Sequence, residues 1–213
     1  MPKVRADISM SLDGFVAGPN QSFEDPLGVG GMQLHEWAFR LEAWRSQHGL
    51  EGGETGVDSA LVEESTSSTD AVVMGRRMFS GGSGPWENDS NAGGWWGDDP
   101  PFHAPVFVVT HHPRELLQQQ GGTSFTFVTD GVESAVQQAR AVADDKDVLV
   151  AGGGSVVQQC LAAGLLDEIQ VHVVPVLLGT GVRLFEDASP ARLEITRVVE
   201  SPLATHIRYR IDR

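Results

Sequence analysis

The sequence predicts a three-layer α/β/α fold around a mixed, mostly parallel central sheet. Three apolar, valine-rich runs of strand length end at glycine or polar residues, namely 71–75, 106–110 and 148–152. Helical patterns separate the strands, at 57–64, 132–143 and 156–161. Alternating strands and helices favour parallel pairing, since a parallel strand needs a crossover connection. Two β-rich runs, 192–199 and 205–211, flank Ser201-Pro202 and predict a C-terminal antiparallel hairpin.

The other segments complete this scheme. Residues 3–10 alternate between apolar and polar and predict the first strand, and 124–128 and 169–176 predict two more. Residues 33–48 carry Leu34, Trp37, Ala38, Leu41 and Trp44 at helical spacing, which predicts one helix. Segments 18–31 and 80–102 are polar and rich in glycine, and predict long loops. A loop as long as 80–102 is either a functional lid or a surface excursion.

Length and charge restrict what the protein does. A chain of 213 residues suffices for a single domain over 1–213. Its net charge of −14 repels DNA and anionic membranes, so we expect neither as a partner. No apolar stretch reaches membrane-spanning length and no signal peptide is visible, which predicts a cytoplasmic protein. Cys160, the only cysteine, falls among apolar helical positions and is expected to be a buried thiol.

The most informative stretch is the glycine triplet Gly152-Gly153-Gly154, which separates the strand at 148–152 from a helical pattern. Glycines leave no side chains between the backbone and a ligand above the turn. The helix that follows directs unpaired N–H groups and a positive dipole end to the same place. The triplet therefore predicts a phosphate-binding turn.

Two further strand ends carry basic or polar side chains. Arg76 and Arg77 follow Gly75, and Thr110 and His111 follow the strand at 106–110. A guanidinium group suits a phosphate, and cations at a helix start are unfavourable unless an anion is present. The alternative is that the arginines are solvated charges. Adjacent histidines on an extended segment point to opposite sides, so we expect no metal site.

In their order along the chain, these motifs resemble the cofactor elements of the dihydrofolate reductase superfamily. Segments 11–14 (SLDG) and 163–169 (AGLLDEI), the latter running on to 175–179 (PVLLG), resemble the C-terminal reductase domain of riboflavin biosynthesis. The resemblance covers nearly the whole chain, and the dinucleotide fingerprint G-x-G-x-x-G is absent. It implies a dihydrofolate-reductase-like fold and NADPH as the cofactor.

The chain departs from both relatives. Riboflavin reductases usually have a glutamate before the glycine pair, where this chain has Ala151. They also tend to have Asp-Asp-Pro after the second strand, where this chain has Arg76 and Arg77, as dihydrofolate reductases do. Dihydrofolate reductases have a buried acid in the first long helix, a place for which this chain offers Glu36.

The resemblance also assigns the cofactor contacts. The strand-end arginines and the Thr110-His111 pair would hold the adenosine 2′-phosphate, the glycine turn the pyrophosphate, and the loop after the first strand the nicotinamide. The cofactor-binding residues implied are Val16, Ala17, Gly18, Gly75, Arg76, Arg77, Thr110, His111, Gly152, Gly153, Gly154, Ser155, Val156, Leu178 and Gly179.

Hydride transfer to a C=N or C=O bond also needs a proton donor. Asp13, after the first strand, is the first candidate, and Glu36 is the second. The alternatives are a turn aspartate in an Asp-Gly pair and a solvated helix face. The candidate substrate contacts are Asp13, Trp37, Trp86 and Phe102, although helical spacing also allows Trp37 to be a core residue.

These observations predict an NADPH-dependent oxidoreductase that reduces a small, flat heterocyclic or carbonyl-containing substrate. Within that class, one alternative is a riboflavin-pathway reductase acting on a ribosylaminopyrimidine, or a dihydrofolate-type reductase. The other is a non-catalytic nucleotide- or ligand-binding module. We expect a homodimer, with the apolar run 171–175 contributing to its contacts.

Overall fold

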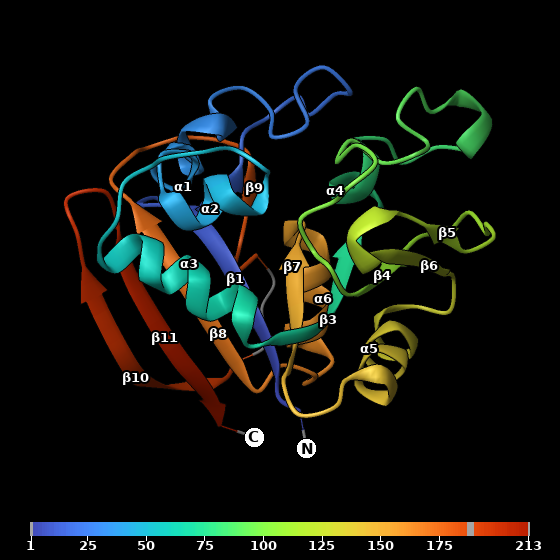
Figure 1. Cartoon of the computed structure of the whole chain (residues 1–213). Coiled ribbons are helices and arrows are strands. Elements are labelled where there is room, and N and C mark those ends of the chain that lie inside the picture. The colour runs from blue at the N-terminus through green and yellow to red at the C-terminus, as the bar shows by residue number, and fades with distance from the viewer. Residues whose placement is uncertain (1, 187–189, 213) are drawn as a thin grey trace.

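A nine-stranded sheet forms the centre of the computed structural model, which describes residues 2–186 and 190–212 (Figure 1). The strand order is β10-β11-β8-β1-β7-β3-β4-β6-β5. The parallel strands are β1 (Val4–Ser11), β3 (Thr69–Gly75), β4 (Pro105–Val109), β6 (Ser124–Val128), β7 (Asp147–Gly152) and β8 (Glu168–Val174). The antiparallel strands are β5 (Leu117–Gln118), β10 (Arg192–Glu200) and β11 (Thr205–Asp212). The predicted mixed sheet and C-terminal hairpin are confirmed.

Helices cover both faces of this sheet. On one face, α5 (Val132–Val142) and α6 (Gly154–Ala162) share a core with the central strands. On the opposite face lie α1 (Glu36–Phe39), α2 (Glu42–Gln47) and α3 (Val57–Ser67) (Figure 1). Beside them on this face, α4 (Arg76–Ser80) and the loop 80–102 cover β3, β4 and β6 around a second apolar cluster. A small sheet of β2 (Phe15–Ala17) and β9 (Val182–Arg183), and the 3₁₀ turns Gly31–Leu34, Trp86–Asn88 and Gln120–Gly122, complete the described elements.

The single helix expected over 33–48 is wrong, because α1 and α2 are separate and a 3₁₀ turn precedes them. Leu41 has extended backbone angles at the start of α2. Its neighbours Arg40 and Glu42 exchange backbone hydrogen bonds with Glu54, at 2.8 and 3.0 Å. This local pairing interrupts the helix although the apolar spacing continues through it.

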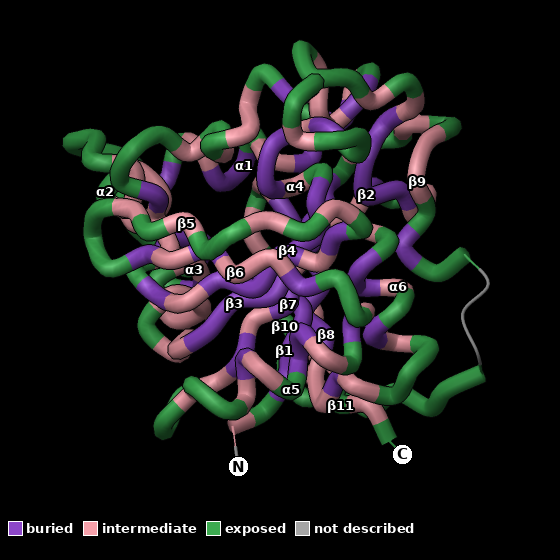
Figure 2. Tube along the Cα trace, turned by 90° about the vertical axis from the view of Figure 1, so that its right-hand side faces the viewer, coloured by how far each residue is buried: buried purple, intermediate pink, exposed green. Residues whose placement is uncertain are grey.

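Strand β1 alternates as predicted, but both of its faces are buried. Val4 and Ala6 pack into the core under α5 and α6. Arg5 and Ser9, on the opposite face, are only 6% and 5% exposed. Strands flank β1 on both sides and layers cover it on both faces, as the buried centre of Figure 2 shows. Its polar positions therefore face the protein interior rather than water.

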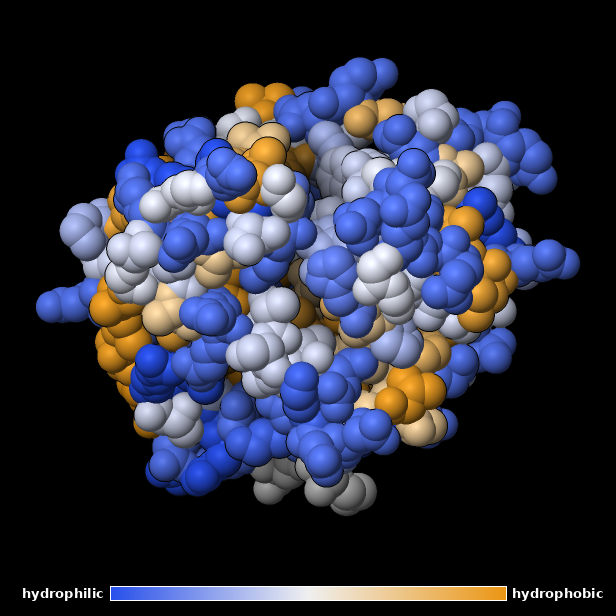
Figure 3. Space-filling model, in the orientation of Figure 1, coloured by the Kyte–Doolittle hydropathy of each residue, from blue (hydrophilic) through white to orange (hydrophobic). Residues whose placement is uncertain are grey.

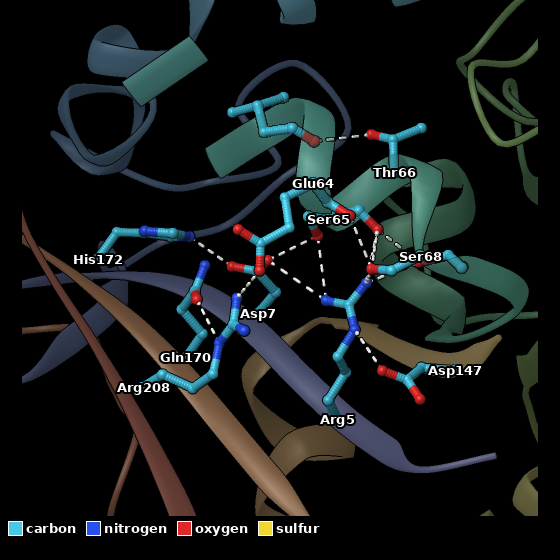
Figure 4. A network of polar contacts seen from close by, with 12 residues as sticks. Arg5, Asp7, Glu64, Ser65, Thr66, Ser68, Asp147, Gln170, His172 and Arg208 are labelled. Atoms are coloured by element: carbon cyan, nitrogen blue, oxygen red, sulfur yellow. Dashed lines mark hydrogen bonds and ion pairs between the residues drawn. The ribbon is translucent and has the colours of Figure 1, made fainter. Parts of the chain in front are cut away.

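Arg5 joins the central strand to the end of α3 (Figure 4). Its guanidinium donates to the Ser65 carbonyl at 2.6 Å and to the hydroxyl of Thr69 at 2.8 Å. It also lies 3.6 Å from Asp7 Oδ2 and 3.5 Å from Asp147 Oδ2. A cation here neutralises the Asp7 and Asp147 carboxylates and satisfies the Ser65 carbonyl group at a helix C-terminus.

We expect Arg5→Met to lower the free energy of unfolding by about 3–5 kcal/mol, because it leaves buried carboxylates without their cation. Arg197→Met is the matched control. The Arg197–Glu64 pair is exposed, with side chains 44% and 40% accessible, so its loss should cost about 0–1 kcal/mol. Urea unfolding of both variants measures the difference. Equal losses would contradict this role of Arg5.

Candidate active site

The strand ends singled out in the sequence meet at one edge of the sheet, at the top of Figure 1. Met74 pairs with Gly152, and Gly75 pairs with Val109. The glycine turn after β7, the arginines after β3 and Thr110 after β4 are therefore neighbours. In open α/β sheets, ligands bind at this carboxyl edge of the strands.

The glycine turn packs against two other segments of the predicted cofactor site. A Cβ at Gly154 would lie 2.8 Å from Val16 Cγ2, and a Cβ at Gly75 would lie 3.0 Å from Val156 Cγ2. A Cβ at Gly181 would lie 2.1 Å from the Ala17 carbonyl oxygen. The structure thus brings together the turn, the loop after β1 and the loop after β8. Val16, Ala17 and Val156 are buried, so their side chains pack inside the protein rather than toward a ligand.

Gly153 is the open position in this cluster. A Cβ built on it would meet nothing within 4 Å, and its φ of −67° suits any residue. Gly153 is the N-cap of α6, and no side chain caps that helix. Free space above a helix start with uncapped N–H groups fits a phosphate. Ser155, in the first turn of the helix, is exposed beside it.

Asp13 connects the loop after β1 to the loop after β8 through hydrogen bonds. Its carboxylate accepts hydrogen bonds from the backbone N–H groups of Leu178, at 3.1 Å, and Gly179, at 2.7 Å. A hydrogen bond with Ser11 and these two N–H groups lower the pKa of Asp13 to about 2. An ionised carboxylate held in this way suits a structural role and is poorly suited to donate a proton at neutral pH.

The two arginines after β3 differ in their surroundings. Arg76 is 6% exposed, donates to Ser80 and Asp89, and lies over the Trp86 ring at 3.6 Å from its centroid. Burial lowers the pKa of Arg76, and Asp89 opposes that shift. Its guanidinium therefore already has an anionic partner. Arg77, by contrast, is exposed.

The residues after β4 differ in the same way. Thr110 is buried, and its hydroxyl accepts a hydrogen bond from the backbone N–H of His112 at 3.1 Å. His111 is exposed. Of the four residues expected around the 2′-phosphate, Arg77 and His111 are thus the accessible ones.

A cavity of about 250 Å³ lies on the α1–α3 face of the sheet, next to the glycine turn. Figure 3 shows a furrow near the middle of this side of the molecule, with apolar atoms visible inside it. Residues of β1, β7, β8 and α3 line the cavity, as does Phe102 from the long loop. Ala151, directly before Gly152, is one of them. The cavity therefore begins one residue away from the predicted phosphate turn.

Only some of the expected catalytic and substrate-binding residues line the cavity. Trp37 and Phe102 line the cavity. Glu36 is exposed and is not among the lining residues. Trp86 also lies outside the lining, where it packs on Phe79 and Phe127 and donates to the His112 carbonyl oxygen. This geometry favours Trp37 and Phe102 as substrate contacts over Glu36 and Trp86.

Sequence reasoning missed a polar group on the cavity wall. Asp7 of β1 and His172 of β8 both line the cavity and are hydrogen-bonded to each other. Burial would raise the pKa of Asp7, but His172 and Arg5 outweigh it and hold that pKa below its ordinary value. The alternation of β1 and β8 contained the signal, because Asp7 and His172 occupy polar positions of strands whose alternate positions are apolar, and both strands lie inside the sheet.

Three further features of residues 2–186 and 190–212 bear on function: metal-binding groups, membrane-spanning helices and the cysteine. There, no group of three or more His, Cys, Asp or Glu residues is arranged to hold a metal ion. No helix of this part of the chain is long and apolar enough to cross a membrane. Cys160 is buried as expected, and burial raises the pKa of its thiol to about 12.

Comparison with known families identifies the type of domain. The family model of the RibD C-terminal domain matches residues 2–206. The chain belongs to this family. Its membership supports an oxidoreductase, and the fold is shared with solved members of the same group.

One such structure is a putative riboflavin biosynthesis protein from Shewanella sp. PV-4, at 22% identity and TM-score 0.65, with 99% of each chain covered. Another is a riboflavin biosynthesis reductase from Saccharomyces cerevisiae, at 10% identity and TM-score 0.55, covering 100% of this chain and 89% of that one. A third is dihydrofolate reductase from Enterococcus faecalis complexed with NADP(H), at 14% identity and TM-score 0.54, covering 99% and 97%. No curated protein matches the chain. The predicted dihydrofolate-reductase-like fold is confirmed.

The hydrogen bonds from Leu178 and Gly179 to the Asp13 carboxylate predict a pH-dependent contribution to stability. The pKa of Asp13 in the folded protein is below its ordinary value of 3.8, so its carboxylate stabilises the fold above pH 4. That contribution is lost as the pH falls through about 2. We expect Asp13→Asn to be less stable than the parent protein at pH 7, and the difference to shrink between pH 4 and pH 2. Thermal unfolding across this range measures the difference in stability, and a difference that stays constant would contradict the stabilising role of the Asp13 carboxylate.

Proposed function

We propose that this protein is an NADPH-dependent reductase acting on a small, flat heterocyclic or carbonyl-containing substrate. The observation that carries the proposal is the position of the open glycine turn beside a cavity with a buried carboxylate and imidazole. Family membership supports it. When bound, the reduced nicotinamide would supply the hydride.

The residues present fit such a cofactor. The turn Gly152–Val156 offers free space and helix N–H groups to the pyrophosphate. Arg77 and His111 are available to an adenosine 2′-phosphate. The loop after β1 and the segment Leu178–Gly179, which Asp13 holds together, would enclose the nicotinamide. In a chain of net charge −14, these local features would hold an anionic ligand.

The substrate would occupy the cavity between Trp37 and Phe102. Aromatic walls favour a flat ring, which can stack on them. A ribosylaminopyrimidine or a pterin is a narrower candidate within this class, in line with the riboflavin biosynthesis and dihydrofolate reductase names of the three solved relatives. A non-catalytic ligand-binding module is the second candidate, favoured by the absence of a suitable acid at Asp13 and Glu36.

We retain a homodimer as part of the proposal, but on a different surface. The run 171–174 lies within β8, which pairs with β1 on one side and β11 on the other, so it does not form a free edge. The edge strand β10 exposes Leu193, Ile195 and Val198 instead. These residues are the better candidates for contacts between two copies.

Gly153→Val tests the function directly. The wild-type protein should bind NADPH in a calorimetric titration, and the variant should not, because the side chain fills the free space above α6. Gly93→Val is the control, since Gly93 is also open and lacks a positive φ. Both variants should unfold at the parent temperature. Wild-type protein that binds neither NADPH nor NADH would refute the proposed function, and normal binding by Gly153→Val would refute the role of the turn.

Arg77→Ala tests recognition of the 2′-phosphate. A charged hydrogen bond to phosphate contributes about 1.5–3 kcal/mol, so we expect NADPH affinity to fall about 10- to 150-fold while NADH affinity stays unchanged. Arg192→Ala, an exposed change of equal charge on β10, should affect neither. Arg76→Ala should mainly destabilise the protein, because Asp89 loses its buried partner. Equal weakening of NADPH and NADH by Arg77→Ala would exclude this role.

A further inference from the structure

Four titratable side chains form a continuous hydrogen-bonded chain behind the cavity. His172 Nε2 contacts Asp7 Oδ1, and His172 Nδ1 lies 2.6 Å from His206 Nδ1. His206 Nε2 lies 2.7 Å from Asp58 Oδ1. The Trp37 ring packs on both imidazoles, with centroids 4.7 and 5.1 Å away. The chain thus runs from the cavity wall to α3 across β8 and β11.

The geometry determines how many hydrogens this chain holds. Each of its three contacts needs one hydrogen, because two facing lone pairs repel each other. Two neutral imidazoles between two carboxylates supply only two hydrogens. The chain therefore holds one proton more than two neutral histidines and two carboxylates provide, and with both carboxylates ionised that proton makes one ring an imidazolium. Two carboxylates at the ends compensate for its burial.

Three further polar groups lie around the chain. Ser65 donates to Asp7 Oδ2 at 2.7 Å, and Arg5 lies on the same side of that carboxylate. His35 also lines the cavity, but burial and then His172 lower the pKa of His35 to about 4, so it is neutral at pH 7. Burial and then His172 lower the pKa of His206 as well. His172 contacts two titratable groups, Asp7 and His206. Around them, Arg5 lies 3.6 Å from Asp7, Asp58 lies 2.7 Å from His206, and His35 lines the same cavity.

We propose that the Asp7–His172 pair is the acid that protonates the substrate, and that His206 and Asp58 are positioning residues which hold its extra proton. This inference rests on the proposed reductase function. Both members of the pair line the cavity, whereas Asp13 and Glu36 do not. The Asp7–His172 pair would thereby be the proton donor that Asp13 and Glu36 do not provide.

One proton moves from the Asp7–His172 pair to the substrate. The Nε2–H bond of His172 breaks, its electron pair stays on the imidazole, and the proton passes to Asp7 Oδ1, with which Nε2 is hydrogen-bonded. The new O–H bond of Asp7 then breaks as an O–H or N–H bond forms on the substrate, and Asp7 is left as a carboxylate. A bound reduced nicotinamide would supply the two electrons that reduce the C=O or C=N bond, as a hydride, and would be oxidised in return. His172 then keeps its Nδ1–H for His206, and the new substrate O–H or N–H can donate to Asp7. Water restores the proton after the product leaves.

The first test needs no activity. In ¹⁵N-histidine NMR of the full chain at pH 7, we expect one of the two rings, 172 or 206, to have the signature of a doubly protonated imidazole, and the other that of a neutral one. His172→Gln and His206→Gln assign the signals. Two neutral rings at pH 7 would overturn the proposal.

The second test separates the acid from the cofactor site. In stopped-flow reduction of 7,8-dihydrofolate and of 9,10-phenanthrenequinone by bound NADPH, His172→Gln should slow hydride transfer by about 10²- to 10⁴-fold at pH 7. Its NADPH affinity should be unchanged. The wild-type rate should fall as the pH rises and the extra proton is lost, and His172→Gln should lose this dependence.

Matched variants complete the test. His48→Gln makes the same change outside the cavity lining and should keep the wild-type pH dependence, whereas His206→Gln should shift it. If His172→Gln retains the wild-type rate and pH profile while the wild type binds NADPH, the acid is elsewhere and the reductase function stands. Wild-type protein that binds no NADPH would refute the reductase function, and the acid role with it. Binding without reduction of either probe would also overturn the acid role.

Discussion

The structure depends on a buried ionic network on its central strand. Arg5 and Asp7 point from β1 into the protein interior, where they meet the end of α3, Asp147 and His172. Charges away from water are tolerated only when they are paired and hydrogen-bonded. This requirement sets the position of α3 relative to β1 and β8, and it leaves a polar wall beside an otherwise apolar cavity.

Two chemically different regions therefore adjoin along β1 and β7. At the carboxyl edge, glycines and a helix start leave space for an anionic ligand. Deeper in the sheet, Asp7 and His172 present ionisable groups to the cavity. Ala151 joins the two, because it lines the cavity and precedes the turn. A ligand bound at the edge and one held in the cavity would thus be within reach of each other, which a two-substrate reaction requires.

The local parts of this site were predictable from the sequence. The glycine turn follows from residue types that act over a few positions, and so do the strand ends at Gly75 and Val109. The partners of Arg76 were not predictable, because Asp89 lies in an irregular loop whose path depends on how Trp86 packs. The break at Leu41 was equally hidden, since its cause is a backbone contact with Glu54, twelve residues beyond Glu42.

By itself, the sequence determined the alternation of the main strands and helices, the parallel sheet and the meeting of the glycine turn and the strand-end arginines at one edge. These features follow from periodicity and from glycine, whose effects are local. Only the tertiary structure decided that the polar positions of β1 face a cavity rather than water, and that His172 meets His206 from another strand. The physical reason is that alternation shows which residues share a face, whereas the strands and helices packed around that face determine whether it is buried.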